Sequence, residues 1–467
     1  MSARILIQVS YIVVAMLFIL GLRSMASPVT ARRGIVWAGV GMVIATLVTF
    51  ITPEMKNFVL MIAAIVIGGS IAWYLGKVVK MTDMPQMVAV YNGMGGGAAA
   101  AIAALEFARG DVHGTMMTVL AVLGALIGSV AFSGSCVAFA KLQGLMNRVW
   151  RLPAQNAVNF VMALIAVVLG GMIIYAGSAD SFGDPMKFKL MLIAFFIVSL
   201  VLGVILTSPI GGADMPVVIS LLNAFTGLAV GFEGYVLGNP ALIIAGIVVG
   251  ASGTLLTQLM AKAMNRPITN IIFTPITGEA ISSGEGITGS LKEVSALDAA
   301  AMMRYAQKVI IIPGYGMAVA GAQHKVWEMT KLLEEEGVEV KFAIHPVAGR
   351  MPGHMNVLLA EAGVPYDKIF DLEEINEEFP QADVALVIGA NDVVNPSART
   401  DKSSPIYGMP ILNADHAQNV IVIKRGRGVG YSGIENALFY GENTRMLYGS
   451  AQQAVAQVIA NVKSMQG

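Results

Sequence analysis

One stretch decides the fold of the C-terminal part of this chain: Ile311-Ile312-Pro313-Gly314-Tyr315-Gly316-Met317-Ala318-Val319-Ala320. Its apolar start is typical of a buried strand, and the Gly-x-Gly that follows leads into residues with helical spacing. Glycines at such a joint allow a tight turn and the close approach of a pyrophosphate, while a helix N-terminus favours anionic oxygens. Many α/β turns contain glycines, but the strand before this pair and the helix after it favour a dinucleotide site that includes Gly314, Tyr315 and Gly316.

The sequence around this joint alternates between strand and helix patterns from about residue 301 onward. Helical spacing is found at 317–336 and 354–362. Strands are predicted at 309–313, 338–344, 366–371, 384–388, 410–412, 420–424 and 445–448. Strands that alternate with helices predict an open parallel sheet, so we expect residues 301–467 to form a Rossmann-like α/β domain.

Two features of this domain favour NADP(H) over NAD(H). The second strand ends at Ile344-His345-Pro346, without the acidic residue that would bind a free ribose 2′-hydroxyl. The strand at 420–424 leads into a run of cations and glycines. A run of charges is more often a solvated surface, but the preceding strand and the glycines favour contact with phosphate here. The members of this run are Lys424, Arg425, Gly426, Arg427, Gly428, Val429, Gly430 and Tyr431.

Two further loops follow strands, at the edge where open α/β sheets bind ligands. They are residues 347–354 and 389–396. His345 and His354 could be interpreted as metal ligands or general bases, but no Cys or Glu has a matching spacing. We therefore expect no metal site, and both histidines to order their loops.

Composition separates a membrane part from a water-facing part. Of the 467 residues 56% are hydrophobic and 13% are charged, and the charged residues are concentrated after residue 266. The formal net charge is zero, which gives no reason to expect nucleic acid as a partner. The single cysteine, Cys136, excludes an internal disulfide and a cysteine-cluster metal site.

Residues 1–266 contain nine runs long enough to cross a bilayer, since a hydrocarbon core of about 30 Å needs roughly 20 apolar residues as helix. The first is followed by Arg23 and further apolar runs, so we interpret it as a span and not as a signal peptide. The loops on one side carry ten Lys and Arg and those on the other side five, which places the C-terminal domain in the cytoplasm and the N-terminus outside. Residues 267–300, with frequent Pro, Gly and Ser, are predicted to be a linker. The predicted spans are 5–23, 35–52, 57–76, 84–107, 115–140, 156–177, 188–207, 214–236 and 240–261.

Polar residues inside these spans have two interpretations. Asn92, Asn223 and Ser252 could line a wetted pathway, since lipid offers polar groups no partner. Ser and Gly more often allow helices to pack closely, and Asn also bonds between helices, so the two interpretations are evenly balanced for Asn223. No histidine lies in a span and Glu106 lies near a span end, so we expect no obvious titrating group in mid-membrane. That expectation weighs against a self-contained proton pump.

The chain resembles the beta subunit of proton-translocating NAD(P) transhydrogenases. The resemblance implies a membrane domain followed by an NADP(H)-binding domain. It also implies hydride transfer to or from NAD(H) on a separate alpha subunit that carries further transmembrane helices, linked to inward proton movement. The assembled complex would be a dimer in the lipid of a bacterial inner membrane. The matching segments, spread over nearly the whole chain, are 211–218, 313–320, 345–362, 389–392, 424–425 and 430–431.

The resemblance further assigns roles to residues. Asp392 would sense the protonation or conformational state near the nicotinamide, and Asp214 would connect the proton path to the nucleotide domain. Asn92 stands where some members have a histidine, so the titrating group must lie on a partner chain or be replaced by water held by Asn92 and Asn223. Ser450-Ala451 replaces a familiar Asp-Ala. Besides Tyr315 and the run from Lys424 to Tyr431, the implied NADP contacts are Val347, Ala348, Gly349, Arg350, Met351, Pro352, Gly389, Ala390, Asn391, Asp392, Val393, Gly408, Met409, Ser450 and Ala451.

Two other functions compete with this interpretation. A channel gated by a nucleotide-sensing domain would be expected to show a carbonyl-rich filter loop, and none is evident. A membrane quinone reductase would need a flavin, haem or iron–sulfur relay, and the lone cysteine excludes the last of these from this chain. One dinucleotide site cannot by itself transfer hydride between two nucleotides, so a transhydrogenase requires a partner with an NAD site.

Overall fold

The computed structural model describes residues 3–465, apart from 26, 52–56, 111, 113, 147–149, 179–184, 213, 274–289, 352, 403, 405, 427–429 and 431. At residues 3, 4, 28, 81, 177, 178 and 185 only the backbone is described. The chain forms two compact units. One contains Met1–Pro209 and Val218–Leu256, and the other contains Ile210–Val217 and Thr257–Gly467.

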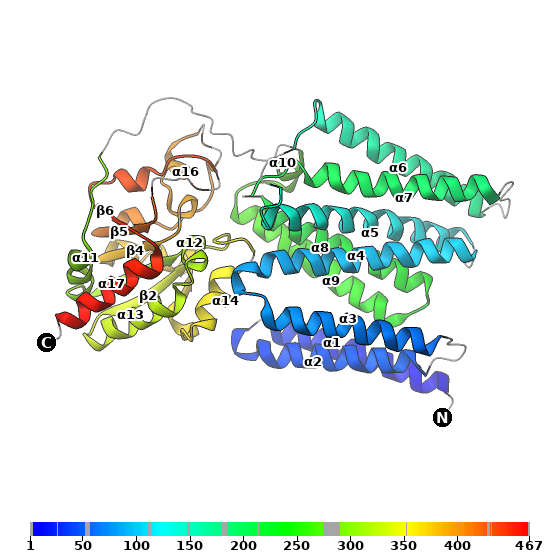
Figure 1. Cartoon of the computed structure of the whole chain (residues 1–467), viewed down its shortest axis with the longest axis horizontal. Helices are drawn as coiled ribbons and strands as arrows, with labels where there is room; N and C mark the ends of the chain where they lie inside the picture. Colours follow the sequence, from blue (N-terminus) through cyan, green and yellow to red (C-terminus); the bar gives the residue numbers. More distant parts are fainter. Residues whose placement is uncertain are drawn as a thin grey trace. The chain divides into compact units, whose positions relative to one another are not determined.

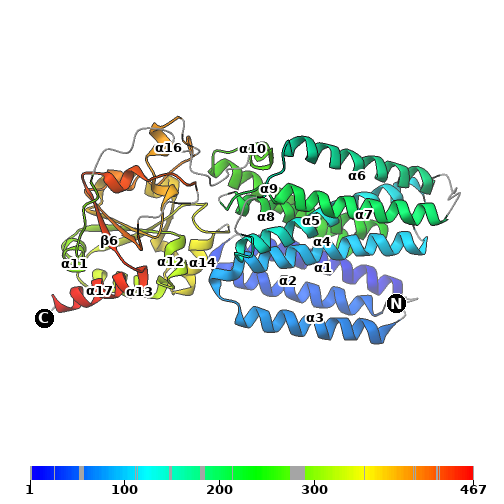
Figure 2. The ribbon, with the colours of Figure 1, turned by 45° about the horizontal axis from the view of Figure 1, so that its top comes forward.

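Nine long apolar helices form the membrane half, and they run alongside one another (Figures 1 and 2). Within the described residues these nine are the helices that have the length and composition to cross a membrane, so the prediction of nine spans is confirmed. A helix suits this environment because it satisfies its backbone hydrogen bonds internally. The nine are α1 (Ala3–Met25), α2 (Pro28–Thr49), α3 (Phe58–Val78), α4 (Met84–Arg109), α5 (Thr115–Leu142), α6 (Gln155–Ser178), α7 (Pro185–Thr207), α8 (Met215–Val236) and α9 (Pro240–Ala263).

Glycines bring α8 and α9 into backbone contact. A Cβ added at Gly246 would lie 2.3 Å from the backbone nitrogen of Gly231, and one at Gly227 would lie 2.5 Å from that of Gly250. Real Cβ atoms do not come so close, so any larger residue would push the two helices apart. For these glycines close helix packing is therefore the reason for the residue type.

The C-terminal domain is built on a six-stranded parallel sheet with the order β3-β2-β1-β4-β5-β6. Ile311 of β1 pairs with Phe342 of β2 on one side and with Leu386 of β4 on the other. All three side chains are fully buried, as expected for a parallel sheet covered on both faces. The predicted Rossmann-like fold is confirmed. The strands are β1 (Lys308–Pro313), β2 (Glu339–Ile344), β3 (Ile369–Asp371), β4 (Val384–Ile388), β5 (Asn419–Lys424) and β6 (Thr444–Tyr448).

The two faces of this sheet are covered differently. Helices α11, α13 and α17 cover one face (Figure 1). The other face is covered mainly by irregular segments, whose Phe379, Leu412 and Phe439 pack in one cluster with Ile312 and Val387 of the sheet. The α-helices that follow α9 are α10 (Ile268–Phe273), α11 (Ala296–Arg304), α12 (Tyr315–Val319), α13 (Gln323–Glu335), α14 (His354–Glu361), α15 (Leu372–Ile375), α16 (Ser397–Thr400) and α17 (Ala451–Ser464). Short 3-10 turns lie at Met81–Asp83, Tyr366–Lys368, Phe379–Gln381, Asp392–Val394, Ala414–His416 and Ala437–Tyr440.

Three predicted elements differ from the structure. The helix expected at 317–336 is divided into α12 and α13, because Gly321 takes a left-handed conformation with φ +61°. The strand expected at 410–412 is wrong: Leu412 donates its N–H to Val393 O at 2.9 Å, and the segment lies as buried coil against the sheet. Pro410 also lacks the N–H that a strand would need there. The strand expected at 366–371 begins only at Ile369, after a 3-10 turn.

The predicted linker, residues 267–300, contains α10 at its start and the first residues of α11 at its end. Ser295 caps α11, since its hydroxyl accepts the N–H of Asp298 at 3.1 Å. Serine is a preferred N-cap residue, so the sequence could have predicted that a helix begins here, although we did not predict it. Residues 274–289 of the linker lie outside the described residues.

Candidate nucleotide-binding site

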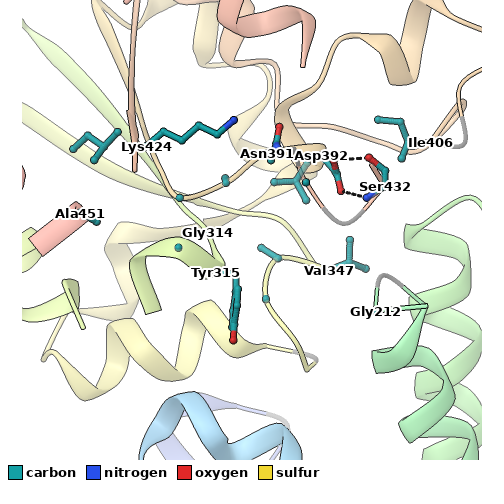
Figure 3. Close-up of a pocket in the computed structure, with 18 of the residues that line it drawn as sticks. Gly212, Gly314, Tyr315, Val347, Asn391, Asp392, Ile406, Lys424, Ser432 and Ala451 are labelled. Atoms are coloured by element: carbon teal, nitrogen blue, oxygen red, sulfur yellow. Dashed lines mark hydrogen bonds between the residues drawn. The ribbon is translucent and has the colours of Figure 1, made fainter. Parts of the chain in front are cut away.

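A pocket opens at the carboxyl ends of the central strands of the C-terminal domain (Figure 3). The chain leaves β1 toward β2 and leaves β4 toward β5, so the order of strands reverses between these two neighbours. Open α/β sheets bind ligands at such a point. In this domain the pocket is lined by residues 314–316 after β1, 347–349 after β2, 389–393 after β4, 406 and 409 in the segment before β5, 423 and 424 at the end of β5, 425, 426, 430 and 432 after β5, and 449 and 451 after β6.

The glycines after β1 and β4 lock two turns together. Gly314 donates its N–H to Ile388 O, and Gly316 donates to Gly389 O, both at 2.9 Å. A Cβ at Gly314 would lie 2.4 Å from Cα of Ala390, and Gly389 has φ +65°. The close approach of a pyrophosphate is one reason for glycine at these positions. The structure adds a second reason, because the two turns could not come together with side chains at these positions.

Asp392 holds the loop that follows β5. Ser432 donates its backbone N–H to Asp392 Oδ2 at 3.0 Å and its hydroxyl to Oδ1 at 2.7 Å (Figure 3). A Cβ at Gly430 would lie 2.3 Å from Oδ1, so only glycine leaves room for this carboxylate. Asp392 therefore joins the turn after β4 to the glycine run after β5.

Lys424 brings a partly desolvated cation to the pocket. Its side chain extends from β5 toward Asn391 (Figure 3), and Nζ lies 4.4 Å from the ring centroid of Phe439. Burial lowers the pKa of Lys424, while the charges of Glu435 and Asp392 act in the opposite direction. Arg425 follows directly and also lines the pocket. Two adjacent cations at a rim of glycine backbone form a surface that favours a phosphate group.

Tyr315 and His354 organise the other side of the pocket. The Cζ atom of Arg350 lies 4.4 Å from the ring centroid of Tyr315, so this guanidinium stacks on the ring. Arg350 donates its backbone N–H to Nδ1 of His354 at 3.2 Å. Burial, and then the charge of Arg350, lower the pKa of His354 to about 4, so the ring is neutral at neutral pH.

His345 occupies the position after β2 where an acidic residue would bind a ribose hydroxyl. Its Nε2 lies 2.7 Å from Pro410 O, and its Nδ1 accepts the N–H of Val347 at 3.2 Å. Burial lowers its pKa to about 4. Both histidines thus make the contacts of loop-ordering residues, which is what the sequence analysis expected of them.

Most of the residues predicted to bind the cofactor line the pocket together, and a few do not. Arg350 lies over Tyr315, and Ser450 precedes α17 at its N-cap position without a side-chain capping bond. Met351 and Gly408 are not part of the wall. Four residues of the wall in this domain were not predicted: Ile406, Ile423, Ser432 and Gly449. Ser432 could have been found, since it directly follows the glycine run, whereas nothing in the sequence distinguishes the two isoleucines. Pro352, Arg427, Gly428, Val429 and Tyr431 lie outside the described residues.

The membrane half brings one of its predicted polar residues, Asn92, together with hydroxyl groups of two other helices. Asn92 of α4 donates from Nδ2 to the Ser135 hydroxyl of α5 at 3.3 Å, and Thr226 of α8 donates to Asn92 O at 3.2 Å. Asn223 lies one turn before Thr226 on the same helix. Ser252 differs, because its hydroxyl donates to Val249 O of its own helix at 3.3 Å.

Two acidic residues are fully buried, one directly before α8 and one within it. Asp214 pairs with Arg266 at 3.4 Å. Glu233, which the sequence analysis overlooked, is 1% exposed near the other end of the helix. The expectation concerned mid-membrane, whereas Glu233 lies three residues before the end of α8, so it adds a buried acid near a span end that the sequence analysis did not consider. An acidic residue within the apolar run Gly231-Phe232-Glu233-Gly234 was the available signal.

Comparison with known proteins agrees with this architecture. Residues 7–461 match the model of a family described as NAD(P) transhydrogenase beta subunit. The NAD(P) transhydrogenase subunit beta of Rhodospirillum rubrum is 48% identical to this chain over an alignment of 467 positions. The alignment covers 97% of this chain and 98% of that protein. A second sequence with the same name, from a defined strain of that species, matches equally well.

Proposed function

Because the chain belongs to the NAD(P) transhydrogenase beta subunit family, and so is an oxidoreductase subunit that works with an alpha subunit, we propose that it binds NADP(H) in the pocket between β1 and β4. We further propose that hydride passes between this NADP(H) and NAD(H) on the alpha subunit while a proton crosses the membrane. The nine spans make it a membrane protein. The proposal places it in a bacterial inner membrane as part of a dimeric complex.

One observation carries the choice of NADP(H). Around the same pocket, the acidic ribose ligand after β2 is replaced by a buried neutral His345, and Lys424 and Arg425 stand after β5. This set would pair with a 2′-phosphate and leaves a free 2′-hydroxyl without its usual acceptor. The chemistry of the residues therefore fits NADP(H) better than NAD(H).

The residues of the chain have separate tasks in this proposal. The glycine backbone at 314–316 and 389–391 would admit a pyrophosphate closely. Lys424 and Arg425 would bind the phosphate of the ribose, and Asp392 would keep the loop at Ser432 in place over the cofactor. The nicotinamide, when bound, supplies the hydride chemistry, so the protein needs no acid or base of its own for that step.

The membrane half would carry the proton. We keep the division into a translocating part at 1–266, a linker at 267–300 and a nucleotide part at 301–467. The cluster of Asn92, Ser135 and Thr226, with Asn223 beside it, offers the polar groups that an ordered water chain needs. Asp214, ion-paired with Arg266, would stand at the cytoplasmic end of this path.

Two measurements test the proposal. Calorimetric titration of the full chain in detergent should give much tighter binding for NADP than for NAD, and equal affinities would remove the assignment. In vesicles, the chain assembled with its alpha subunit should couple reduction of an NADP analogue by NADH to a change of internal pH. The chain without that subunit should do neither. Hydride transfer with no pH change, in vesicles that hold an imposed gradient, would refute the coupling.

A further inference from the structure

Glu233 is a buried acid without a partner. Its side chain is 1% exposed, and neither carboxyl oxygen has a hydrogen-bond partner among the described residues. An isolated charge in such a place is costly, whereas binding a proton removes the charge. An ionisable residue inside a membrane helix therefore indicates a function.

The neighbouring helix makes room for this carboxyl. A Cβ at Gly124 of α5 would lie 2.1 Å from Glu233 Oε1, so the smallest change at this glycine would collide with the acid. Ala121, one turn before this glycine on α5, and Ala125, directly after it, are fully buried in an apolar cluster that also includes Phe107 of α4. The acid is thus held in a fitted, apolar site.

A second carboxyl lies within electrostatic reach. Glu106 of α4 is the charged residue whose field acts on Glu233 among the described residues. Two negative charges that lie near each other in an apolar site repel, and a proton bound by Glu233 removes this repulsion. Other charged residues on the helices of this region are Arg109, three residues beyond Glu106, Lys187 and Lys189 at the start of α7, and Lys141 and Lys262 at the opposite ends of α5 and α9.

The position of Glu233 extends the polar cluster described above. Ten residues of helix separate it from Asn223, a rise of about 15 Å. By the distribution of Lys and Arg, this end of α8 faces the outer side. A polar route along α8 would therefore begin at Glu233, pass Thr226 and Asn223, and end near Asp214.

We propose that Glu233, together with Glu106, is the proton-binding site at the outer end of the membrane half. This inference rests on the proposed function and names the titrating group that Asn92 cannot supply. A proton from the outer aqueous side adds to a carboxylate oxygen of Glu233, which becomes neutral, and the same proton later leaves toward the Asn92 cluster. No electrons move in this step. The site suits a proton and not a metal cation, because hard cations take six or more oxygen ligands and the described residues provide two carboxyls.

The test uses the full chain assembled with its alpha subunit in vesicles, with hydride transfer and internal pH followed in one sample. Glu233→Gln keeps the shape and removes the titration. We expect proton movement to fall at least tenfold, with NADP binding changed less than twofold. Ser199→Ala, a buried hydroxyl on α7 that bonds its own helix, is the matched control and should behave as wild type. Full proton movement in Glu233→Gln would overturn the assignment.

Two further readouts separate a proton site from a structural role. Removing the negative neighbour by Glu106→Gln should shift the pH profile of turnover to lower pH by roughly one unit. An unshifted profile would exclude the pairing. Infrared spectra of wild type should show a protonated carboxyl band that titrates with external pH and is lost in Glu233→Gln. If this band responded to Na⁺ and not to pH, the site would bind a metal cation and not a proton, and the proposal would be refuted.

These readouts also keep the two proposals apart. If wild type transfers hydride without moving protons, the proposed function fails, whatever Glu233 does. If wild type moves protons and Glu233→Gln moves as many, only the present inference fails. Should Glu233→Gln not assemble, Glu233→Asp keeps a titrating group on a shorter side chain. We expect the Glu233→Asp variant to assemble and to move some protons. If it assembles but moves none, the result counts against the site.

Discussion

Replacing Lys424 and Arg425 together by alanine tests the pocket most directly. Both residues line it, and each would contribute a charge-assisted contact to the 2′-phosphate of NADP. NAD lacks this phosphate, so its binding loses little when the two cations are removed. The selectivity between the two nucleotides is therefore the quantity to measure.

The size of the effect follows from the surroundings of each cation. A hydrogen bond to a charged group contributes about 1.5–3 kcal/mol. Lys424 is partly buried, and burial lowers its pKa, so its contact is poorly screened by water. Arg425 is exposed and should contribute less. A sum of about 3 kcal/mol corresponds to a roughly hundredfold loss of NADP affinity, since about 1.4 kcal/mol is tenfold.

Calorimetric titration of both nucleotides onto the full chain measures this loss. Lys325→Ala with Lys463→Ala is the matched control, because it removes two cations that pair with Glu328 and do not line the pocket. We expect the control to bind both nucleotides as wild type does. Equal losses for NADP and NAD in the double variant, or a similar loss in the control, would refute the reasoning.

Three other predictions concern helix packing, the membrane path and pH. Gly246→Ala should lower the thermal stability of the membrane half by several degrees, because its Cβ would meet Gly231 at 2.3 Å, while Gly68→Ala, with open space around it, should not. Asn223→Leu should block or uncouple turnover in vesicles but leave NADP binding intact, and unchanged coupled turnover would make Asn223 a packing residue. His345, whose pKa burial lowers to about 4, stays neutral in the folded domain while the unfolded chain takes up a proton below about pH 6.5. Its contribution to stability, about 3 kcal/mol, is thus present above pH 6.5 and is lost as the pH falls from 6.5 to 4. The hydrogen-exchange protection factors of the β1 amides, which are corrected for the intrinsic pH dependence of exchange, should fall over that range in wild type and fall by less in His345→Gln, where His354 still titrates.

The parts of the fold that the sequence predicted are those governed by local patterns. Apolar runs predicted the nine spans, and the buried run before Gly314 predicted β1 and the joint that follows it. The pocket residues after each strand were predicted for the same reason, since the carboxyl ends of parallel strands meet at one edge.

The parts that were missed depend on contacts between distant segments. Leu412 lies in an apolar run that looks like a strand, but its N–H bonds to Val393 in a loop. Ser432 belongs to the site because Asp392, forty positions earlier, accepts its hydroxyl. Glu233 is significant only because Gly124 on another helix leaves space for it. None of these pairings has a local pattern in the sequence.

The irregular cover on one face of the sheet has a consequence for how this domain can vary. Segments such as 375–382, 410–417 and 437–440 consist mostly of coil and short 3-10 turns, yet they supply the apolar side chains that close the core. Insertions and deletions, which ordinary loops accept, would open a cavity in this layer. Among relatives we therefore expect length differences to avoid these segments, and substitutions to accumulate instead on the outward sides of α11, α13 and α17.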